Sequence, residues 1–523
     1  MPAIISDQFR ILNAANFVAG VADTSQYYYS FIGLPNSQDV TAGYGQTDWN
    51  TNTPAPMDGF KEYNDAWDTM LGLKQLSSDD VQRMVKKTTW TAGTVYEMYK
   101  NGYTRENQSP KTSSTNLYDA QYYVVNSDLK VYICINNGQS PDNPQGRQSL
   151  DEPTFVDLEP RAAGASGDGY VWKYLYTINP SDIVKFDSTN YIPVPSDWAD
   201  SDTNASVRDN AVDGSIKIVT ITNRGVGLGT ANAVYTNVPI KGNGTGAECT
   251  ITMNADSQVD TVVVSNQGSG YTYGNIDLVA GGVPTGSTRP VFDVIIPPQG
   301  GHGADIFREL GTKNVLLYSR FENDIQNPDF ITGNQVARVG IVEKPDTFGT
   351  NTPLSADKAS AVLALRLTGT GYSSATYDAD SFITQTVGTG ITAVARVVNY
   401  DQATGVLKVW QDRAQSGFNT VGAAITNPQY GFDQADFTAS PTGDGSLTII
   451  GGSVQEGLQI DSTFTGVSTV INNRTFYLGQ SFTNGIANPE VAKYSGNIIY
   501  VDNRPSVTRS TNQKEDIKVI LQF

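Results

Sequence analysis

Apolar and polar residues alternate over the last residues of the chain. Ile517, Val519, Leu521 and Phe523 alternate with Lys518, Ile520 and Gln522. This two-residue period predicts a strand with one buried face. An aromatic residue that ends the chain at a core-facing position is expected to pack against the core or a neighbour. Between this strand and a preceding apolar run, the sequence predicts a polar loop that turns at Asn503-Arg504-Pro505.

Apolar residues three or four positions apart predict helices near the N-terminus. The first 20 residues are expected to form a helix that Ser6 caps, with Phe9, Leu12 and Asn16 on one stripe. The same spacing predicts a second short helix over residues 63–71.

A third short helix is expected at Val81, Met84 and Val85, behind Ser78-Asp79-Asp80. Between the first two helices, Tyr27, Tyr29 and Phe31 predict a strand with one aromatic face. Residues 35–60 are rich in Pro, Gly, Asn and Thr and are expected to be a loop.

Strand patterns dominate from Trp90 to Trp198. Two apolar runs flank Asn126-Ser127-Asp128, which predicts a hairpin. After a loop rich in Pro, Gly and Ser, four aromatic residues alternate strictly: Tyr170, Trp172, Tyr174 and Tyr176. This alternation predicts one aromatic face that packs in the core or at an interface.

An internal repeat begins after residues 201–210. Residues 222–227, TNRGVG, match residues 265–270, SNQGSG, and each follows an alternating apolar strand. The glycines are expected to allow tight turns with positive φ. A weaker echo of this style occupies residues 366–450.

Between the two β-rich stretches the sequence again predicts a short helix and strands, as it does in the N-terminal part of the chain. A short helix is expected after Asp305, with a stop at Gly311, followed by strands at 315–318 and before Pro345. We therefore predict a mainly β protein with a few short helices (β/α+β), in which two small β insertion domains interrupt a multi-domain β-sandwich core. The predicted core parts are 1–205, 299–365 and 456–523, and the predicted insertions are 206–298 and 366–455.

Composition agrees with a β-rich chain and disfavours several classes of function. Charged residues make up 17% of the 523 residues, and the net charge is −18. Phosphate contacts need clustered Lys and Arg, so binding of nucleic acid or an anionic membrane is not expected. No apolar run approaches the roughly 18 residues that span a bilayer, and no signal peptide is expected. Folding in a cytoplasm is therefore expected.

The two cysteines, Cys134 and Cys249, both lie in apolar runs, and each is expected to be a buried free thiol. The only histidine is His302, in a Gly-rich turn, where a turn-capping or interface role is expected rather than catalysis. It cannot build a structural zinc site without Cys or His neighbours.

No local motif indicates catalysis, a cofactor or a metal. The Gly-x-Gly runs lack the GK[ST] of a phosphate loop, and strands follow them, so turns are expected. With 53 Asp and Glu, a pair of carboxylates is easy to propose and carries little information without geometry. The acidic turns lack the distal Glu of a calcium loop.

Several segments resemble the baseplate wedge protein called gene product eight of T-even-like, contractile-tailed bacteriophages. They occur in family order at residues 3–18, 167–180, 190–195, 300–311, 337–345 and 495–523. The chain departs from the T-even protein chiefly by its greater length and its two β insertions. The resemblance implies a non-enzymatic structural subunit that forms a homodimer and joins other wedge proteins in the virion tail baseplate, after folding in the bacterial host cytoplasm.

On this interpretation the candidate core or interface residues are the four aromatics at 170–176, Asn503, Arg504, Pro505 and Phe523. Two alternatives stay open. One is a tail-associated protein that binds host-surface glycan through the insertions, where Tyr271, Tyr273 or Tyr372 would be exposed. The other is a tail-associated glycosidase.

Overall fold

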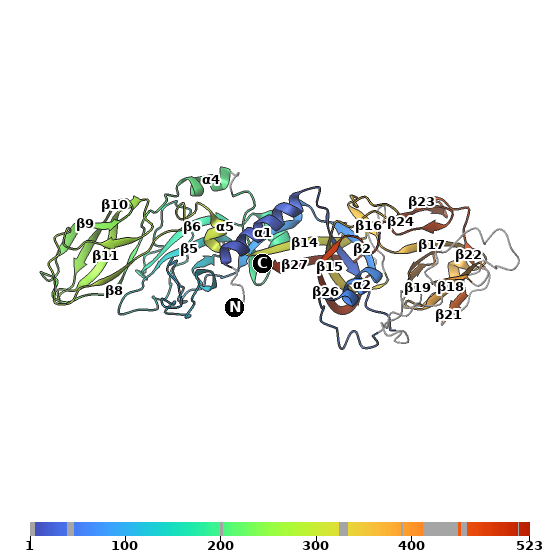
Figure 1. Cartoon of the computed structure of the whole chain (residues 1–523), viewed down its shortest axis with the longest axis horizontal. Coiled ribbons are helices and arrows are strands. Elements are labelled where there is room, and N and C mark those ends of the chain that lie inside the picture. Colours follow the sequence, from blue (N-terminus) through green and yellow to red (C-terminus); the bar gives the residue numbers. More distant parts are fainter. Residues whose placement is uncertain are drawn as a thin grey trace. The chain divides into compact units, whose positions relative to one another are not determined.

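The chain is mainly β and forms two compact units (Figure 1). The computed structural model describes residues 6–38, 46–198, 202–323, 333–388, 391–411, 448–450, 458–510 and 512–523. Over these residues there are 27 strands in seven sheets and five α-helices. Unit 1 contains residues 1–18, 82–316 and 520–523, and unit 2 contains residues 19–81 and 317–519. The mainly β, multi-sheet class predicted from the sequence is confirmed.

Unit 1 has a first core built around a three-stranded antiparallel sheet. The strands are β4 (Tyr123–Val125), β5 (Lys130–Asn137) and β6 (Tyr170–Thr177). Around them lie a 3-10 helix, η2 (Leu117–Asp119), and the helices α1 (Asp7–Ala22, which unit 1 shares with unit 2), α3 (Pro180–Phe186), α4 (Asp202–Asp209) and α5 (Ile306–Leu310). Large aromatic side chains fill this core, including Tyr96, Tyr122, Tyr132, Tyr170, Trp172 and Tyr176.

Local side chains explain the hairpin and the short helix. The Asn126 side-chain oxygen accepts hydrogen bonds from the N–H groups of Asp128 (3.0 Å) and Lys130 (2.8 Å), which closes the turn between β4 and β5. Asp305 caps α5 by accepting from the N–H groups of its first turn, and Gly311 ends it at φ +69°. Both predictions are confirmed.

Residues 216–296 of unit 1 have a hydrophobic core of their own. A sheet in the order β11-β10-β9-β12 contains β9 (Val234–Gly242), β10 (Thr245–Met253), β11 (Val259–Ser269) and β12 (Gly274–Ile276). A second pair joins β8 (Val219–Asn223) to β13 (Val291–Val294). Ile251 and Val259 are fully buried between them, as is the free thiol of Cys249.

The two repeat segments make the same local turn. The Asn223 side chain accepts the N–H of Gly225 at 2.8 Å, and the Asn266 side chain accepts the N–H of Gly268 at 3.2 Å. Gly225 has φ +69° and Gly268 has φ +59°, as the repeat predicted. Where the predicted insertions begin and end stays a prediction.

Unit 2 contains a five-stranded antiparallel sheet in the order β16-β2-β1-β15-β26. Its strands are β1 (Tyr28–Gly33), β2 (Met70–Gln75), β15 (Gln335–Glu343), β16 (Lys358–Ser360) and β26 (Asn497–Thr508), and α2 (Phe60–Asp68) packs beside them. Tyr29 and Phe31 are fully buried in one cluster with Trp67 of α2. This confirms the aromatic face predicted for the strand at residues 27–31.

A larger sheet and a hairpin follow in unit 2. The sheet consists of β17 (Leu363–Thr368), β18 (Phe382–Gly388), β19 (Ile391–Asp401), β20 (Val406–Trp410), β21 (Thr448–Ile450), β22 (Gln459–Ile460) and β25 (Ile486–Ala487). The hairpin joins β23 (Gly466–Ile471) to β24 (Arg474–Phe482). Gly405 lies in the turn of the hairpin that β19 and β20 form.

A further four-stranded sheet has the order β27-β14-β3-β7. Its strands are β3 (Val81–Lys86), β7 (Tyr191–Pro193), β14 (Asn314–Glu322) and β27 (Lys514–Gln522). The helix predicted at residues 81–85 is therefore wrong. Ser77 and Asp80 form a capping box around a single 3-10 turn, η1 (Ser78–Asp80), and the chain then enters β3, whose pairing with β7 overrides the helical spacing.

The stripe predicted on the first helix is also wrong. Ser6 does cap α1, because its hydroxyl accepts the N–H of Phe9 at 3.3 Å. However, Phe9 and Leu12 are about half exposed. The helix instead buries Ile11 and Ala14, one position before and two after Leu12.

Candidate interaction surfaces

The aromatic strand predicted as a core or interface signature lies in the core of unit 1. Tyr170 and Trp172 are fully buried, and their rings stack with centroids 5.3 Å apart. Both rings also contact Tyr96 edge-on, and the Tyr170 hydroxyl accepts the Tyr96 N–H at 2.8 Å. This part of the signature is therefore core, and it is closed to a partner.

The strict alternation of the four aromatics is broken by a bulge in β6. Val131 lies opposite Tyr176 and Tyr132 lies opposite Tyr174, so Leu175 has no partner in β5. Tyr176 is fully buried and Tyr174 only partly. The prediction of a single continuous aromatic face is wrong at this end, because the inserted residue changes the register.

Residues 503–505 lie in unit 2, within β26 and not in a loop. Opposite β15, Val336 pairs with Val507 and Arg338 pairs with Asn503, so three residues of β26 face one residue of β15. The predicted corner is thus a bulge inside a longer strand. Pro505 is tolerated there because β26 is an edge strand, where a missing N–H need not break the ladder.

Phe523 belongs to unit 1, where the end of the chain is packed as predicted. The Phe523 N–H donates to the carbonyl of Lys313 at 3.0 Å, and its ring lies 5.5 Å from the ring of Phe17 in α1. The eight signature residues are therefore divided between the two units.

A groove in unit 2 brings together segments that the sequence separates by more than 400 residues. It has a volume of about 600 Å³. Its walls are the loop before α2, the first turns of α2, and the N-terminal half of β26, from Ile498 to Asn503. Arg338 of β15 lies at its base.

The base of this groove is a closed polar network around Arg338. Its guanidinium donates to the side-chain oxygen of Asn503 (2.9 Å) and to that of Asn36 (2.9 Å). It also donates to the Asp65 carbonyl at 3.0 Å and to the Thr69 hydroxyl. Burial lowers the pKa of Arg338 to about 10, with Asp65 and Asp68 opposing the shift, so the side chain stays charged at neutral pH. A satisfied buried network of this kind fixes the geometry of the base.

The groove carries exposed apolar side chains among polar ones. Of the residues that line it, Met57 is 70% exposed and Ile499 of β26 is 36% exposed. Apolar side chains grouped on a rigid polar base, next to a strand edge, are the ingredients of a protein–protein contact. We call this region the groove surface.

β26 ends its sheet, so its backbone is available on one side. Over the described part of the chain, β15 is its only neighbour in that sheet. The segment 49–54 covers the C-terminal half of its outer edge: Trp49 donates to the Arg504 carbonyl (2.8 Å) and the Asn50 side chain accepts the Ser506 N–H (2.8 Å). The N-terminal half of β26 lines the groove, and open strand edges invite pairing with another chain.

Sequence reasoning missed the groove surface except for Asn503. Met57 lies in a Pro-rich stretch predicted to be a loop. A large apolar residue in such a stretch was a usable signal, because loop side chains usually face solvent. The position of Arg338 in the groove could not be predicted, because it depends on the register of β15 against β26.

His302 is buried beside a carboxylate in unit 1. Its Nδ1 lies 2.5 Å from Oε1 of Glu309 in α5, and Oε2 of Glu309 accepts the N–H of Gly303 at 2.8 Å. The edge of the Tyr99 ring packs against the imidazole, with centroids 4.7 Å apart. The contact between His302 and Glu309 connects the Gly-rich turn to α5, which agrees with a role of His302 in the turn. A role of His302 at an interface stays a prediction.

Other candidate chemistry is limited. Within the described ranges, no group of three or more His, Cys, Asp or Glu could hold a metal ion. Nor is any helix there long and apolar enough to cross a membrane. Tyr271, expected to be exposed for glycan binding, is instead buried, and its hydroxyl donates to the Ile240 carbonyl at 3.0 Å. Tyr273 is 63% exposed.

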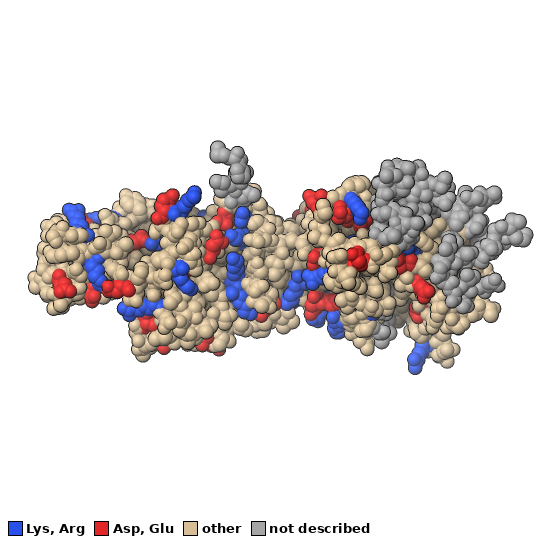
Figure 2. Space-filling view, turned by 90° about the horizontal axis from the view of Figure 1, so that it is seen from below, with Lys and Arg blue, Asp and Glu red and all other residues tan. Residues whose placement is uncertain are grey.

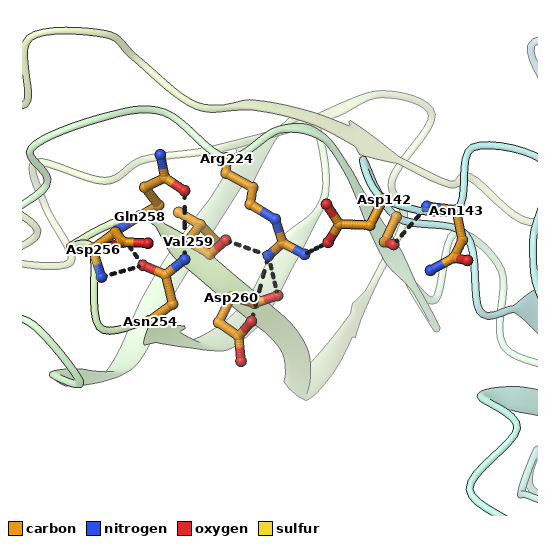
Figure 3. A network of polar contacts seen from close by, with 9 residues as sticks. Asp142, Asn143, Arg224, Asn254, Asp256, Gln258, Val259 and Asp260 are labelled. Carbon is orange, nitrogen blue, oxygen red and sulfur yellow. Dashed lines mark hydrogen bonds and ion pairs between the residues drawn. The ribbon is translucent and has the colours of Figure 1, made fainter.

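Charges are interspersed on the surface. On the face shown in Figure 2, Lys and Arg side chains lie among Asp and Glu over the described residues, and many are adjacent to an opposite charge. Figure 3 shows one such arrangement in unit 1, where Arg224 of the first repeat segment donates to Asp142 (2.7 Å) and to the Val259 carbonyl (2.8 Å). These ion pairs join segments of unit 1 and present little free basic surface.

No family model matches the chain, and no curated protein matches it significantly.

Proposed function

We propose that this chain is a structural subunit of the baseplate wedge of a contractile bacteriophage tail. It acts by assembly with itself and with neighbouring wedge proteins, without catalysis. The ordered resemblance described above supplies the class of particle. The observation that carries the assembly role is the groove surface, where exposed apolar side chains surround a rigid polar base.

The groove surface fits this role for physical reasons. Burying Met57 and Ile499 removes apolar area from water, at roughly 25 cal/mol for each Å². The network around Arg338 is already satisfied, so a partner can dock on it without breaking hydrogen bonds. The accessible edge of β26 adds backbone donors and acceptors that set the register of a partner strand.

Self-association through this surface would use a two-fold axis, which is the commonest symmetry of soluble homo-oligomers. The same patch then serves both subunits, so one substitution changes the interface twice. We expect a homodimer of the purified chain at micromolar concentration.

Sedimentation velocity tests this proposal. The double variant Met57→Lys and Ile499→Lys places charges in the interface and should convert the dimer to monomer. The matched control is Val470→Lys, since Val470 is 67% exposed in the same unit but lies in β23, away from the groove lining. It should stay dimeric.

A wild-type chain that sediments only as monomer at 10–100 μM would count against the homodimer, and a dimer unaffected by the double variant would count against the groove surface. Equal melting temperatures of the three proteins serve as the folding check.

A further inference from the structure

A second groove lies in the β-rich segment of unit 1, whereas the groove surface belongs to unit 2. Its volume is about 480 Å³. The lining comes from the loop that follows β12, from the start of β13, and from single residues of the preceding strands. Phe292, Val279 and Val291 provide apolar walls.

Two cations line this groove without a partner. Lys241 of β9 and Arg289, just before β13, are both exposed. Neither side chain has a hydrogen bond or ion pair with any residue in the described ranges. Elsewhere in unit 1, Arg224 has two acidic neighbours, Asp142 and Asp260, and Lys217 is paired with Glu159.

The local balance of charge is opposite to that of the whole chain. The groove has two cations and one carboxylate, Asp277. Oδ1 of Asp277 accepts the N–H of Ala280 at 3.0 Å, so it serves the turn after β12. The chain as a whole has 53 acidic and 35 basic residues. An anion is therefore drawn to this groove in preference to the surrounding surface.

The remaining lining suits a polyhydroxylated ligand better than a bare ion. Asn275 lies opposite Lys241 in the pairing of β12 with β9, and it brings an amide next to the cation. Thr285 adds a hydroxyl. Amide and hydroxyl groups hydrogen-bond sugar hydroxyls, and apolar and aromatic walls pack against the faces of sugar rings.

We propose that this groove binds an acidic saccharide, with Lys241 and Arg289 holding its carboxylate or phosphate group. Arg289 offers a planar fork that matches either group, and Lys241 adds a second charge. Asn275 and Thr285 bind neighbouring hydroxyls. The site is independent of the groove surface, and the assembly role does not depend on it.

Isothermal titration of the full chain tests the site with three acidic probes and one neutral one. The acidic probes are a galacturonate tetramer, sialyllactose and glucose 6-phosphate, and the neutral probe is maltotetraose. Binding of at least one acidic probe is expected below 10 mM, and it should weaken as salt rises. Lys241→Gln and Arg289→Gln should each reduce the affinity about threefold to tenfold, and the double variant should abolish measurable binding.

The control is Arg105→Gln, an exposed arginine of unit 1 that does not line the groove. It should bind as the wild type does, and all variants should keep the wild-type melting temperature. The proposal is overturned if no acidic probe binds, if the double variant binds normally, or if maltotetraose binds equally well. It is also overturned if inorganic phosphate alone binds as tightly as the best saccharide, since the site would then recognise charge only.

Discussion

At the scale of single residues, the aromatic side chains of unit 1 are the clearest source of stability. Trp172 stacks on Tyr170 and contacts Tyr96 edge-on, and all three are almost fully buried. Contacts between such rings add to the free energy of burial.

Trp172→Ala should lower the free energy of unfolding by roughly 3–5 kcal/mol, because the rigid neighbours cannot close the cavity. Urea denaturation followed by circular dichroism measures this. Phe60→Ala is the control, since Phe60 is largely exposed and its loss should change stability by less than about 0.5 kcal/mol. Equal stability of the wild type and the Trp172 variant would contradict the core assignment.

Both thiols should be unreactive in the folded protein. Cys134 and Cys249 are fully buried, and burial raises the pKa of the Cys249 thiol to about 11. Iodoacetamide at pH 8 should therefore modify neither cysteine in the native protein and both in guanidinium chloride. Mass spectrometry counts the added groups, and rapid native labelling would show that a thiol is accessible.

An ion pair in unit 2 should contribute to the dependence of stability on pH. Arg320 donates two hydrogen bonds to Asp516, at 2.7 and 3.0 Å, and they lower the pKa of Asp516 below its usual value. Because the folded-state pKa lies below the unfolded one, the stabilisation is present above about pH 4 and is lost as the pH falls through the folded pKa.

Arg320→Gln should therefore lower the urea midpoint at pH 7, and the difference from the wild type should shrink towards pH 2.5. Arg105→Gln is the control for the loss of a surface charge. A difference that stays constant with pH would contradict this account.

At the scale of elements, turns and helix ends could be predicted from nearby side chains, whereas the pairing of strands that are distant in the sequence could not. The hairpin at Asn126, the short helix between Asp305 and Gly311, and both repeat turns follow from side chains within a few residues, and they were predicted correctly. The strand at 81–86 was predicted as a helix because its pairing with β7 is not visible in the spacing of apolar residues.

Glycine at the first repeat turn should be required both for its backbone conformation and for space. A Cβ at Gly225 would lie 2.8 Å from the nitrogen of Pro290 and 2.9 Å from the carbonyl oxygen of Thr288. Gly282 has a similar positive φ, but a Cβ there would meet nothing within 4 Å.

Gly225→Ala should thus destabilise the protein clearly more than Gly282→Ala, which pays only the conformational cost of roughly 1 kcal/mol. Thermal unfolding of the two variants compares them directly. Equal losses would show that space at the first turn is not limiting.

At the scale of the whole molecule, the surfaces of interest join distant parts of the sequence. The groove surface combines residues 54–65, Arg338 and residues 498–503. Only Asn503 among these was a candidate from the sequence, because a surface of this kind depends on strand order and register. The mainly β class was predictable from composition and alternation.

The central claim is that the chain is a structural part of a phage tail baseplate. Its most direct test is gold-labelled antibody against this chain on intact virions of the phage that encodes it, viewed by electron microscopy. The account predicts label at the baseplate end of the tail. Label confined to the fibres or the head, or particles that lack the chain altogether, would contradict it.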